Sequence, residues 1–375
     1  MMREEDLAGF LAELKQLTDI ESPSFHLDGV NQVAAWFTQK AHAQGLRSKP
    51  IPMANESVAS GLLISNQPEA ERFDILFLAH MDTVFPVGTL AGTPFTQSGD
   101  RVNALGVIDD KAGALLALYV IKSLDLSRLN VALYLNSHEE IGSLYAKESI
   151  REYAKKSQYC FVMEPARADG SLVATRKGVL TYQIEFDGVA AHSGNNPQQG
   201  RSALVEAANC VVALSKLSDF SLGHTFNSII THGGVAQNIV PDFAALTVEM
   251  RYQYPSSLDF FEQKLESILA NPLQQGTTAR KTCLNHEAPM IDEVNLPRIK
   301  AVFAEAGQEL GMDITWVDAS GVSDGNIASS AGCPTIDGLG PTGGNMHVKS
   351  EYMLASSVVP KCNLILNVIH KLFAR

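Results

Sequence analysis

A histidine and an aspartate with one residue between them, His80 and Asp82, follow an apolar run at residues 75–78. Four apolar residues bounded by a charge and a polar cluster predict a short strand that is buried on both faces. Side chains two positions apart on a strand point the same way, so this pair is expected together at the strand's carboxyl end. Open α/β sheets carry their chemistry at that edge. A structural histidine is the alternative, and further polar groups at the same edge would argue against it.

Further carboxylates and a second histidine follow the other predicted strands. Several like charges that converge on one rim repel one another, and a bound dication removes that cost. Mixed histidine and carboxylate ligands without a thiolate suit zinc, cobalt or manganese. Two histidines with at least three carboxylates exceed the needs of one four-coordinate ion and fit two ions that share a bridge. The additional residues are Asp109 at a predicted helix start, Glu139 and Glu140 after the run 131–135, Glu164 after the run 159–163, and His347 in a glycine-rich turn.

Structural roles compete with these chemical ones. Helix N-termini favour acids, which suits Glu139 and Glu140 without excluding a ligand role, and Asp110 is assigned to such a first-turn or capping position. The alternative for Glu164 is a strand-end acid, and the alternative for His347 is a loop histidine. Surface or packing roles are assigned to His26, His42, His224, His232, His286 and His370.

Composition restricts the class of protein and its partners. The 375 residues are 45% hydrophobic and 19% charged, which is typical of a globular chain with two domains, or one domain with an insertion. A net charge of −12 argues against nucleic-acid and anionic-membrane partners, and no apolar run reaches the ~20 residues of a membrane span. The acidic start is not a signal peptide, and five scattered cysteines without a Cys-x-x-Cys motif indicate free thiols. The sequence therefore predicts a cytoplasmic protein.

Strands and helices alternate up to residue 163. Helical spacing of apolar residues predicts helices near 7–17 and 30–41, and another helix follows residue 106. This alternation predicts an α/β fold, with a mostly parallel sheet and helices on both faces. The strands are expected near residues 57–64, 75–78, 131–135 and 159–163.

The pattern changes after residue 176 and returns near residue 289. Between them a βαββαβ order predicts a ferredoxin-like α+β insertion of a size typical for a domain. Residues 1–176 and 289–375 would then form the catalytic domain, and residues 177–288 an inserted lid or dimerisation domain. The returning part is expected to hold a helix at 296–310, strands at 314–317 and 335–336, and a closing helix from about Tyr352.

These motifs resemble those of the di-zinc peptidases and deacylases. That family includes bacterial glutamate carboxypeptidases, aminoacylases, acetylornithine deacetylase and succinyl-diaminopimelate desuccinylase. The resemblance implies that His80, Asp109 and Glu164 hold one ion, and that Asp109, Glu140 and His347 hold the other. It further implies that Asp82 orients His80. The motifs that carry it are His80-Met81-Asp82, Asp109-Asp110-Lys111, Glu139-Glu140, Glu164-Pro165 and His347.

The residue types predict a hydrolytic mechanism. Two ions lower the pKa of a shared water toward ~7. The resemblance makes Glu139 the general base, which takes the water's proton and passes it to the leaving amine. A metal ion and His192, from the run Ala191-His192-Ser193-Gly194, would stabilise the oxyanion. Related lids usually mediate dimerisation, so a homodimer in which His192 reaches the partner subunit's site is expected.

The substrate class is less sharply defined. Asn238, Arg251 and Gly343 resemble substrate-binding positions, and the run 340–344 is closest to the glutamate-carboxypeptidase branch. However, Ala288 stands where that branch is expected to have a carboxylate-gripping arginine, and His138 stands where an acidic or small residue is more usual. The sequence therefore predicts an amide hydrolase for a small peptide, with an N-acyl-amino-acid deacylase as the alternative.

Two other function classes remain as alternatives. Gly321-Val322-Ser323-Asp324-Gly325 fits the Gly-x-Ser-x-Gly elbow of serine hydrolases, with Asp337 and His347 following in the right order. That assignment would leave the acids at the other strand ends without a purpose. A metal-binding protein without hydrolytic activity could use the same scaffold, although the full ligand set argues against it.

Overall fold

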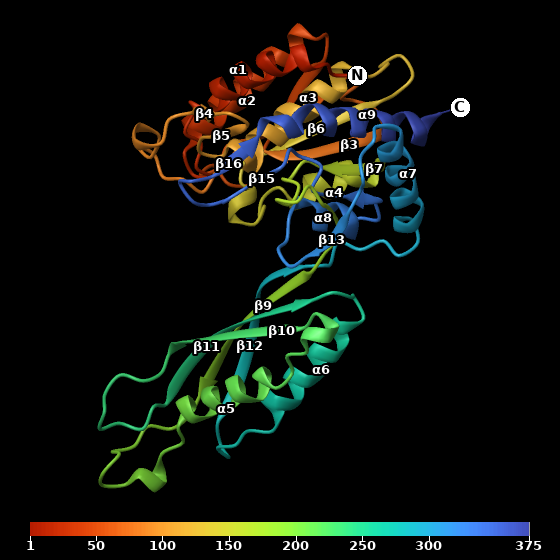
Figure 1. The fold of residues 1–375 in the computed structure, drawn as a ribbon. Helices are drawn as coiled ribbons and strands as arrows, with labels where there is room; N and C mark the ends of the chain where they lie inside the picture. The colour runs from red at the N-terminus through yellow and green to blue at the C-terminus, as the bar shows by residue number, and fades with distance from the viewer. Residues whose placement is uncertain (375) are drawn as a thin grey trace. The chain divides into compact units, whose positions relative to one another are not determined.

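The chain folds into two compact units in the computed structural model, which describes residues 1–374. Unit 1 comprises Met1–Thr175, Met290–Ala319 and the chain from Ser323 onward, and unit 2 comprises Arg176–Pro289 with Ser320–Val322. Figure 1 draws unit 2 in green to cyan, the colours of the middle of the chain. The short contribution of residues 320–322 to unit 2 was not expected from the sequence.

The central sheet of unit 1 is mixed and mostly parallel, as predicted. Its strand order is β1-β2-β6-β3-β7-β14, and the pairs β3–β6, β3–β7 and β7–β14 are parallel. The antiparallel edge strand β1 was missed, because its sequence Arg-Ser-Lys-Pro-Ile has no apolar run and only Ile51 is buried. The strands are β1 (Arg47–Ile51), β2 (Gly61–Ser65), β3 (Phe73–His80), β6 (Val131–Asn136), β7 (Ser157–Val162) and β14 (Thr335–Ile336).

Helices cover both faces of this sheet, because successive strand residues point to opposite sides. On β3, Ile75 and Phe77 pack into one apolar core with α1, α2, α3, α7 and α9, and Leu76 and Leu78 pack into a second core with α4 and α8. No helix within residues 1–374 is long and apolar enough to cross a membrane. The helices are α1 (Leu7–Thr18), α2 (Leu27–Ala43), α3 (Ala112–Lys122), α4 (Lys147–Lys155), α7 (Leu296–Glu309), α8 (Asp324–Ser330) and α9 (Val358–Phe373).

Two smaller sheets complete unit 1. The pair β8–β13 joins Leu172–Arg176 to Trp316–Ala319. The other sheet has the order β15-β16-β5-β4, and its strand β16 occupies residues where the closing helix was predicted to begin. That prediction was wrong at its start, because Tyr352–Leu354 pairs with β5 and the helix begins only at Val358. The strands are β4 (Thr96–Ser98), β5 (Arg101–Asn103), β15 (Gly343–Gly344) and β16 (Tyr352–Leu354).

Unit 2 has the predicted βαββαβ order and an antiparallel sheet, β10-β11-β9-β12. Alternate residues of β9, such as Tyr182, Ile184 and Phe186, are buried against α5 and α6, which lie on one face of the sheet (Figure 1). The elements are β9 (Gly178–Asp187), α5 (Ala203–Ser215), β10 (Thr225–His232), β11 (Phe243–Tyr252), α6 (Ser257–Ala270) and β12 (Thr278–Glu287).

Candidate metal centre

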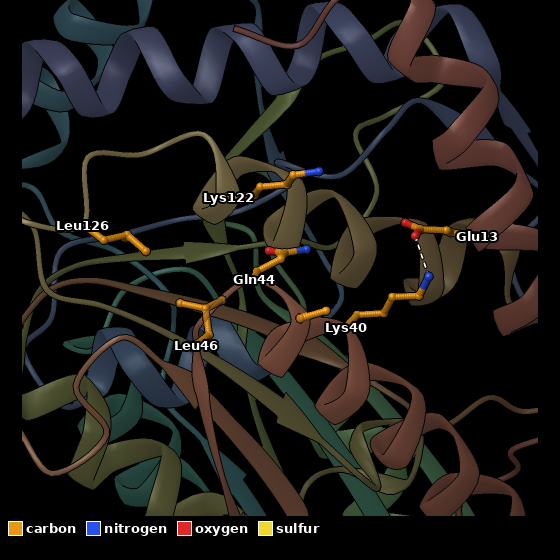
Figure 2. A pocket seen from close by; sticks show the side chains of 7 residues that line it. Glu13, Lys40, Gln44, Leu46, Lys122 and Leu126 are labelled. Carbon is orange, nitrogen blue, oxygen red and sulfur yellow. Dashed lines mark hydrogen bonds and ion pairs between the residues drawn. The ribbon is translucent and has the colours of Figure 1, made fainter.

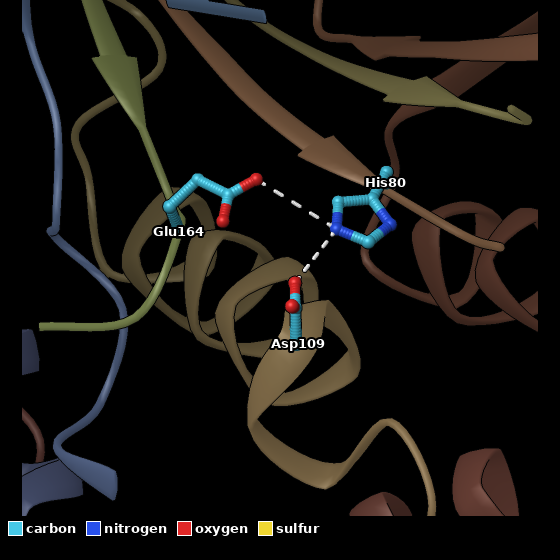
Figure 3. A group of neighbouring side chains, drawn as sticks. All are labelled: His80, Asp109 and Glu164. Carbon is cyan, nitrogen blue, oxygen red and sulfur yellow. Dashed lines mark hydrogen bonds and ion pairs between the residues drawn. The ribbon is translucent and has the colours of Figure 1, made fainter. Parts of the chain in front are cut away.

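Two groups of three side chains in unit 1 have ligand atoms that all lie within 4.8 Å of one another. In the first, His80 Nε2 lies 3.0 Å from Asp109 Oδ1 and 3.7 Å from Glu164 Oε1 (Figure 3). In the second, His347 Nε2 lies 3.2 Å from Asp109 Oδ2 and 3.2 Å from Glu140 Oε2. Asp109 belongs to both groups and presents a different oxygen to each.

Strand ends and loops bring these residues together. His80 is the last residue of β3, Glu164 follows β7, and Glu140 lies in the short 3-10 helix Glu139–Ile141 after β6. The carboxyl ends of neighbouring parallel strands meet at one sheet edge, which explains how distant parts of the chain converge. His347 comes from the turn after β15, with a left-handed φ of 65° and a side chain that is 57% exposed.

The two neighbouring aspartates do not begin a helix, contrary to expectation. Asp109 and Asp110 have non-helical dihedral angles, and α3 starts only at Ala112. The capping role assigned to Asp110 is wrong, because its side chain is fully buried and neither oxygen has a hydrogen-bond partner within residues 1–374. Gly113 makes room for it, since a Cβ at that position would lie 2.0 Å from Asp110 Oδ1.

Asp82 holds the glutamate pair as well as lying beside His80. Its Oδ1 accepts from the backbone N–H of Glu139 at 3.0 Å, and its Oδ2 accepts from that of Glu140 at 3.1 Å and from the Ser24 hydroxyl at 2.6 Å. His80 Nδ1 lies 3.0 Å from the Asp82 carbonyl oxygen and 3.4 Å from Oδ1. A proton on Nδ1 leaves Nε2 as the atom that faces Asp109, which is the tautomer a metal ligand needs.

The ionisation of these groups reflects their crowding. Burial alone would raise the pKa of Asp109, but hydrogen bonds from His347 and His80 hold that pKa below its usual value. Although burial disfavours a charged imidazole, the hydrogen bonds of Asp109 and Asp82 raise the pKa of His80 well above 6.5. The hydrogen bond to Asp109 raises the pKa of His347 to about 9. Positive charge between these carboxylates is therefore strongly favoured.

The glutamate pair is shifted in the opposite direction. Burial, followed by the charge of Glu164, raises the pKa of Glu139 well above its usual value. Burial likewise raises the pKa of Glu140 to about 7. Glu139 belongs to neither ligand group, so its carboxylate remains available for proton transfer.

The donor set fits two divalent ions. Each group offers one imidazole nitrogen and two carboxylates, and neither contains a cysteine. Such oxygen and nitrogen donors suit zinc, cobalt or manganese, and the shared carboxylate of Asp109 suits a bridged pair. His80, Asp109 and Glu164 would hold one ion, and Asp109, Glu140 and His347 the other.

The predicted residues of unit 2 fall into two separate places. His192 is paired with Ile239 in an isolated bridge, and Ser193 N donates to Asn238 O at 3.0 Å, so His192 and Asn238 lie on adjacent exposed loops. Arg251 lies at the far end of β11, where it donates to Glu249 at 2.8 Å and to the Ser320 carbonyl at 2.8 Å. The structure therefore does not bring Arg251 together with His192 and Asn238.

Gly343, in β15 of unit 1, is buried against Ile108.

The serine-hydrolase alternative has no triad. Ser323 Oγ donates directly to Asp337 Oδ2 at 2.6 Å, and it also accepts from Gly325 N at the start of α8. His347, which would have to stand between them, contacts Asp109 and Glu140. The elbow-like run is therefore a helix cap.

Residues 76–371 match the sequence profile described as Peptidase family M20/M25/M40. The chain belongs to this family. Family M20 contains metallopeptidases and related hydrolases that act on C–N bonds, so the predicted resemblance and the class of enzyme are confirmed. The chain is an M20 hydrolase of the carboxypeptidase or acyl-amino-acid deacylase type.

Individual M20 relatives agree with this assignment. Carboxypeptidase G2 of Pseudomonas sp. (strain RS-16) is 30% identical over 296 residues, 76% of this chain and 70% of that protein. Acetylornithine deacetylase of Edwardsiella ictaluri is 25% identical over 358 residues, 91% of this chain and 90% of that protein.

Solved structures support the fold. Aminopeptidase PepT from Bacillus cereus has a TM-score of 0.78 at 19% identity, covering 98% of this chain and 99% of that one. The M20 metallo-carboxypeptidase Sso-CP2 from Sulfolobus solfataricus has a TM-score of 0.70 at 18% identity, with the same coverage. Both likenesses cover 98% of the chain and therefore include both units.

The roles of several polar residues around the candidate centre could not be predicted from the sequence. Asp324 is buried and accepts from Asn136 Nδ2 at 2.8 Å and from Ser143 Oγ at 2.5 Å, which ties down the segment that carries the glutamate pair. His138 accepts from Tyr145 N at 3.0 Å, and burial lowers its pKa, so this unusual residue is a neutral structural histidine. Glu351 contacts the Asp109 segment directly, as described below.

A hollow elsewhere in unit 1 contains none of the predicted residues. It has a volume of about 470 Å³ and lies beside the ion pair of Lys40 and Glu13, whose charged atoms are 2.6 Å apart (Figure 2). Gln44, Lys122 and apolar side chains complete its lining. Its lining has one carboxylate, that of Glu13, and this group is paired with Lys40, so the hollow does not share the crowded carboxylates of the candidate centre.

Proposed function

We propose that this chain is a co-catalytic di-metal hydrolase that cleaves the amide bond of a small peptide, in the manner of a carboxypeptidase. The observation that carries the proposal is the position of Asp109, whose two oxygens lie 3.0 Å from His80 and 3.2 Å from His347. One carboxylate that serves two three-residue groups is the arrangement needed for a bridged pair of ions.

The metals that these residues would hold are two divalent ions, zinc in our proposal, with cobalt or manganese acceptable to the same donors. When bound, they supply Lewis acidity and lower the pKa of a water molecule. Glu139 would take a proton from the attacking water and deliver it to the leaving amine. Asp82 fixes Glu139 for this task through the N–H contacts of the glutamate pair. His192 donates to the oxyanion that develops on the substrate.

Substrate recognition is assigned to Asn238, Arg251 and Gly343. The similarity to carboxypeptidase G2 favours a C-terminal peptidase. The second candidate is an N-acyl-amino-acid deacylase, because Ala288 cannot grip a terminal carboxylate, and acetylornithine deacetylase aligns over 90% of its length.

A homodimer through unit 2 and a cytoplasmic location are part of the proposal. Among the described residues β10 is an edge strand of its sheet, and it carries the exposed Ile229 and Ile230, which suits pairing with a second copy. In such a dimer His192 would act on the partner subunit's substrate. All five cysteines are free thiols, which suits a reducing compartment.

The test is a screen of dipeptides and N-acyl amino acids with metal content measured on the same sample. We expect two ions per chain, hydrolysis that a chelator abolishes and zinc restores, and no effect of serine-directed reagents. Glu139→Gln should keep both ions and lose turnover by about 10²–10⁴-fold, whereas Glu140→Ala should lose one ion. Chelator-resistant hydrolysis, or an active Glu139→Gln variant, would refute the mechanism.

A further inference from the structure

Glu351 is a buried carboxylate that has no part in the proposed proton transfer or in either ligand group. It is 1% exposed and lies four residues after His347. Its Oε1 accepts from Ile108 N at 2.8 Å and from Asp109 N at 3.2 Å, and its Oε2 accepts from Gly106 N at 3.1 Å. One side chain therefore accepts hydrogen bonds from three backbone N–H groups of residues 106–109, and one of these belongs to Asp109 itself.

The segment that receives these bonds cannot satisfy its own N–H groups as a regular helix would. Asp109 has non-helical dihedral angles, and Gly106 has a left-handed φ of 64°. A Cβ at Gly106 would lie 2.5 Å from Thr83 Cγ2, so the tight turn requires glycine. Because residues 106–109 are buried, N–H groups without an acceptor would be costly.

The same turn contacts Asp109 through both its main chain and its side chain. Glu351 N donates to Val348 O at 2.9 Å, and Asn345 Nδ2 donates to Ser350 O at 3.3 Å and to Ser350 Oγ at 3.1 Å, which closes the turn 345–351. His347 projects from this closed turn to within 3.2 Å of Asp109 Oδ2. A shift of the turn would thus move a ligand and the backbone of the shared ligand at once.

We propose that Glu351 is a positioning residue for the metal centre, which fixes the backbone of Asp109 and thereby the spacing of the two ligand groups. The inference rests on the proposed function, because it requires that these groups bind metal. Residues that orient metal ligands typically change affinity or activity 10–100-fold when they are replaced.

Glu351→Gln is the direct test, because glutamine preserves shape and removes one acceptor. Whichever way the amide turns, its NH₂ must face either Gly106 N–H or the N–H groups of Ile108 and Asp109. We expect zinc titration of the metal-stripped full chain, followed by calorimetry, to give an affinity at least tenfold weaker than that of the unmodified chain. Loss of turnover should be reversed in part by excess zinc, which a role in proton transfer would not allow.

Glu206→Gln is the matched control. Glu206 is 4% exposed in unit 2 and accepts from Leu273 N at 3.0 Å and Gln274 N at 2.7 Å, so the change removes a comparable buried acceptor. Its zinc affinity should equal that of the unmodified chain. If Glu351→Gln does not fold, Asn345→Gly opens the turn while tolerating the positive φ, and it should weaken zinc binding about 2–5-fold.

The outcomes separate this inference from the proposed function. An unmodified chain that binds no zinc would contradict the proposed function. If the unmodified chain binds two ions and Glu351→Gln binds them within twofold of that affinity, the positioning role is overturned and the proposed function stands. Equal losses in Glu351→Gln and Glu206→Gln would also overturn it, because the effect would then be general destabilisation.

Discussion

The polar side chains singled out by the sequence are arranged differently in the two units. In unit 1, His80, Asp82 and Asp109 are at most 7% exposed, and they contact each other or the glutamate pair. In unit 2, His192 and Asn238 lie on exposed loops, and Arg251 lies at the other end of β11 with partners of its own.

This difference indicates that folding alone fixes the arrangement of the unit 1 residues but not that of the unit 2 residues. A buried charge is stable only when its partners are already in place, so the geometry of the unit 1 group is fixed in the folded chain. Exposed loop side chains carry no such constraint. We therefore expect unit 1 to determine metal binding by itself, and the residues of unit 2 to act only on the bound substrate.

Asp109→Asn should reduce activity more than any of the changes that follow. A small effect would contradict the view that the buried residues of unit 1 determine metal binding. The change removes the charge shared by both ligand groups, so both ions should be lost. Several kcal/mol of transition-state stabilisation depend on the metals, and kcat/KM should fall roughly 10³-fold or more. Elemental analysis and a hydrolysis assay measure both effects. Retention of two ions per chain would show that Asp109 does not bridge.

His80 and His347 both belong to unit 1, but only His80 is buried, so replacing each in turn tests whether burial sets the contribution to stability. His80→Ala leaves buried carboxylates without their partner, and the free energy of unfolding of the metal-free protein should fall by about 3 kcal/mol. His347→Ala removes a largely exposed imidazole, and the loss should be under about 1 kcal/mol. Each variant should lose one ion. Urea unfolding after metal removal gives the two values, and equal values would show that burial does not distinguish the two ligand groups.

His192→Ala tests the expectation for unit 2. Metal content and stability should be unchanged, while kcat falls about 10²-fold because an oxyanion donor is lost. His232→Ala removes another exposed histidine of unit 2 and should leave kcat unchanged. Loss of metal from His192→Ala would contradict the division of roles between the units.

Lys361→Met concerns stability alone and should leave metal content and kcat unchanged. Lys361 is 4% exposed and makes no hydrogen bond or ion pair within residues 1–374, and burial lowers its pKa to about 8 from 10.5. Below pH 8 both folded and unfolded lysine are charged, so the folded state bears the full penalty, on the order of 3 kcal/mol. Between pH 8 and 10.5 only the unfolded state stays protonated, so stability rises with pH. Lys361→Met should therefore be more stable at pH 7, and this advantage should vanish near pH 10.5 in urea titrations.

Much of the fold could be predicted from the sequence because its elements carry strong periodic patterns. The helices α1 and α2 and the strand β3 have continuous apolar faces, and the predicted order of unit 2 is confirmed. The edge strand β1 could not be predicted, because an edge needs little apolar surface. The start of the closing helix was wrong because pairing of β16 with β5 overrides local preference.

The candidate ligands could be predicted because they follow buried strands, but their supports could not. The acceptor role of Glu351 depends on three N–H groups more than 240 positions away in the chain. Nothing near Asp110 in the sequence indicates that its carboxylate would be buried without a hydrogen-bond partner among residues 1–374. Such contacts arise only from tertiary packing, which single-sequence patterns do not report.

The order of ligands along the chain has a consequence for biosynthesis. His80 and Asp109 are translated long before His347, and the whole of unit 2 is translated after Asp109 and before His347. The group of His80, Asp109 and Glu164 is encoded entirely before unit 2, whereas the second group also needs the turn 345–351. The group of Asp109, Glu140 and His347 therefore cannot form until the segment that carries His347 has been translated.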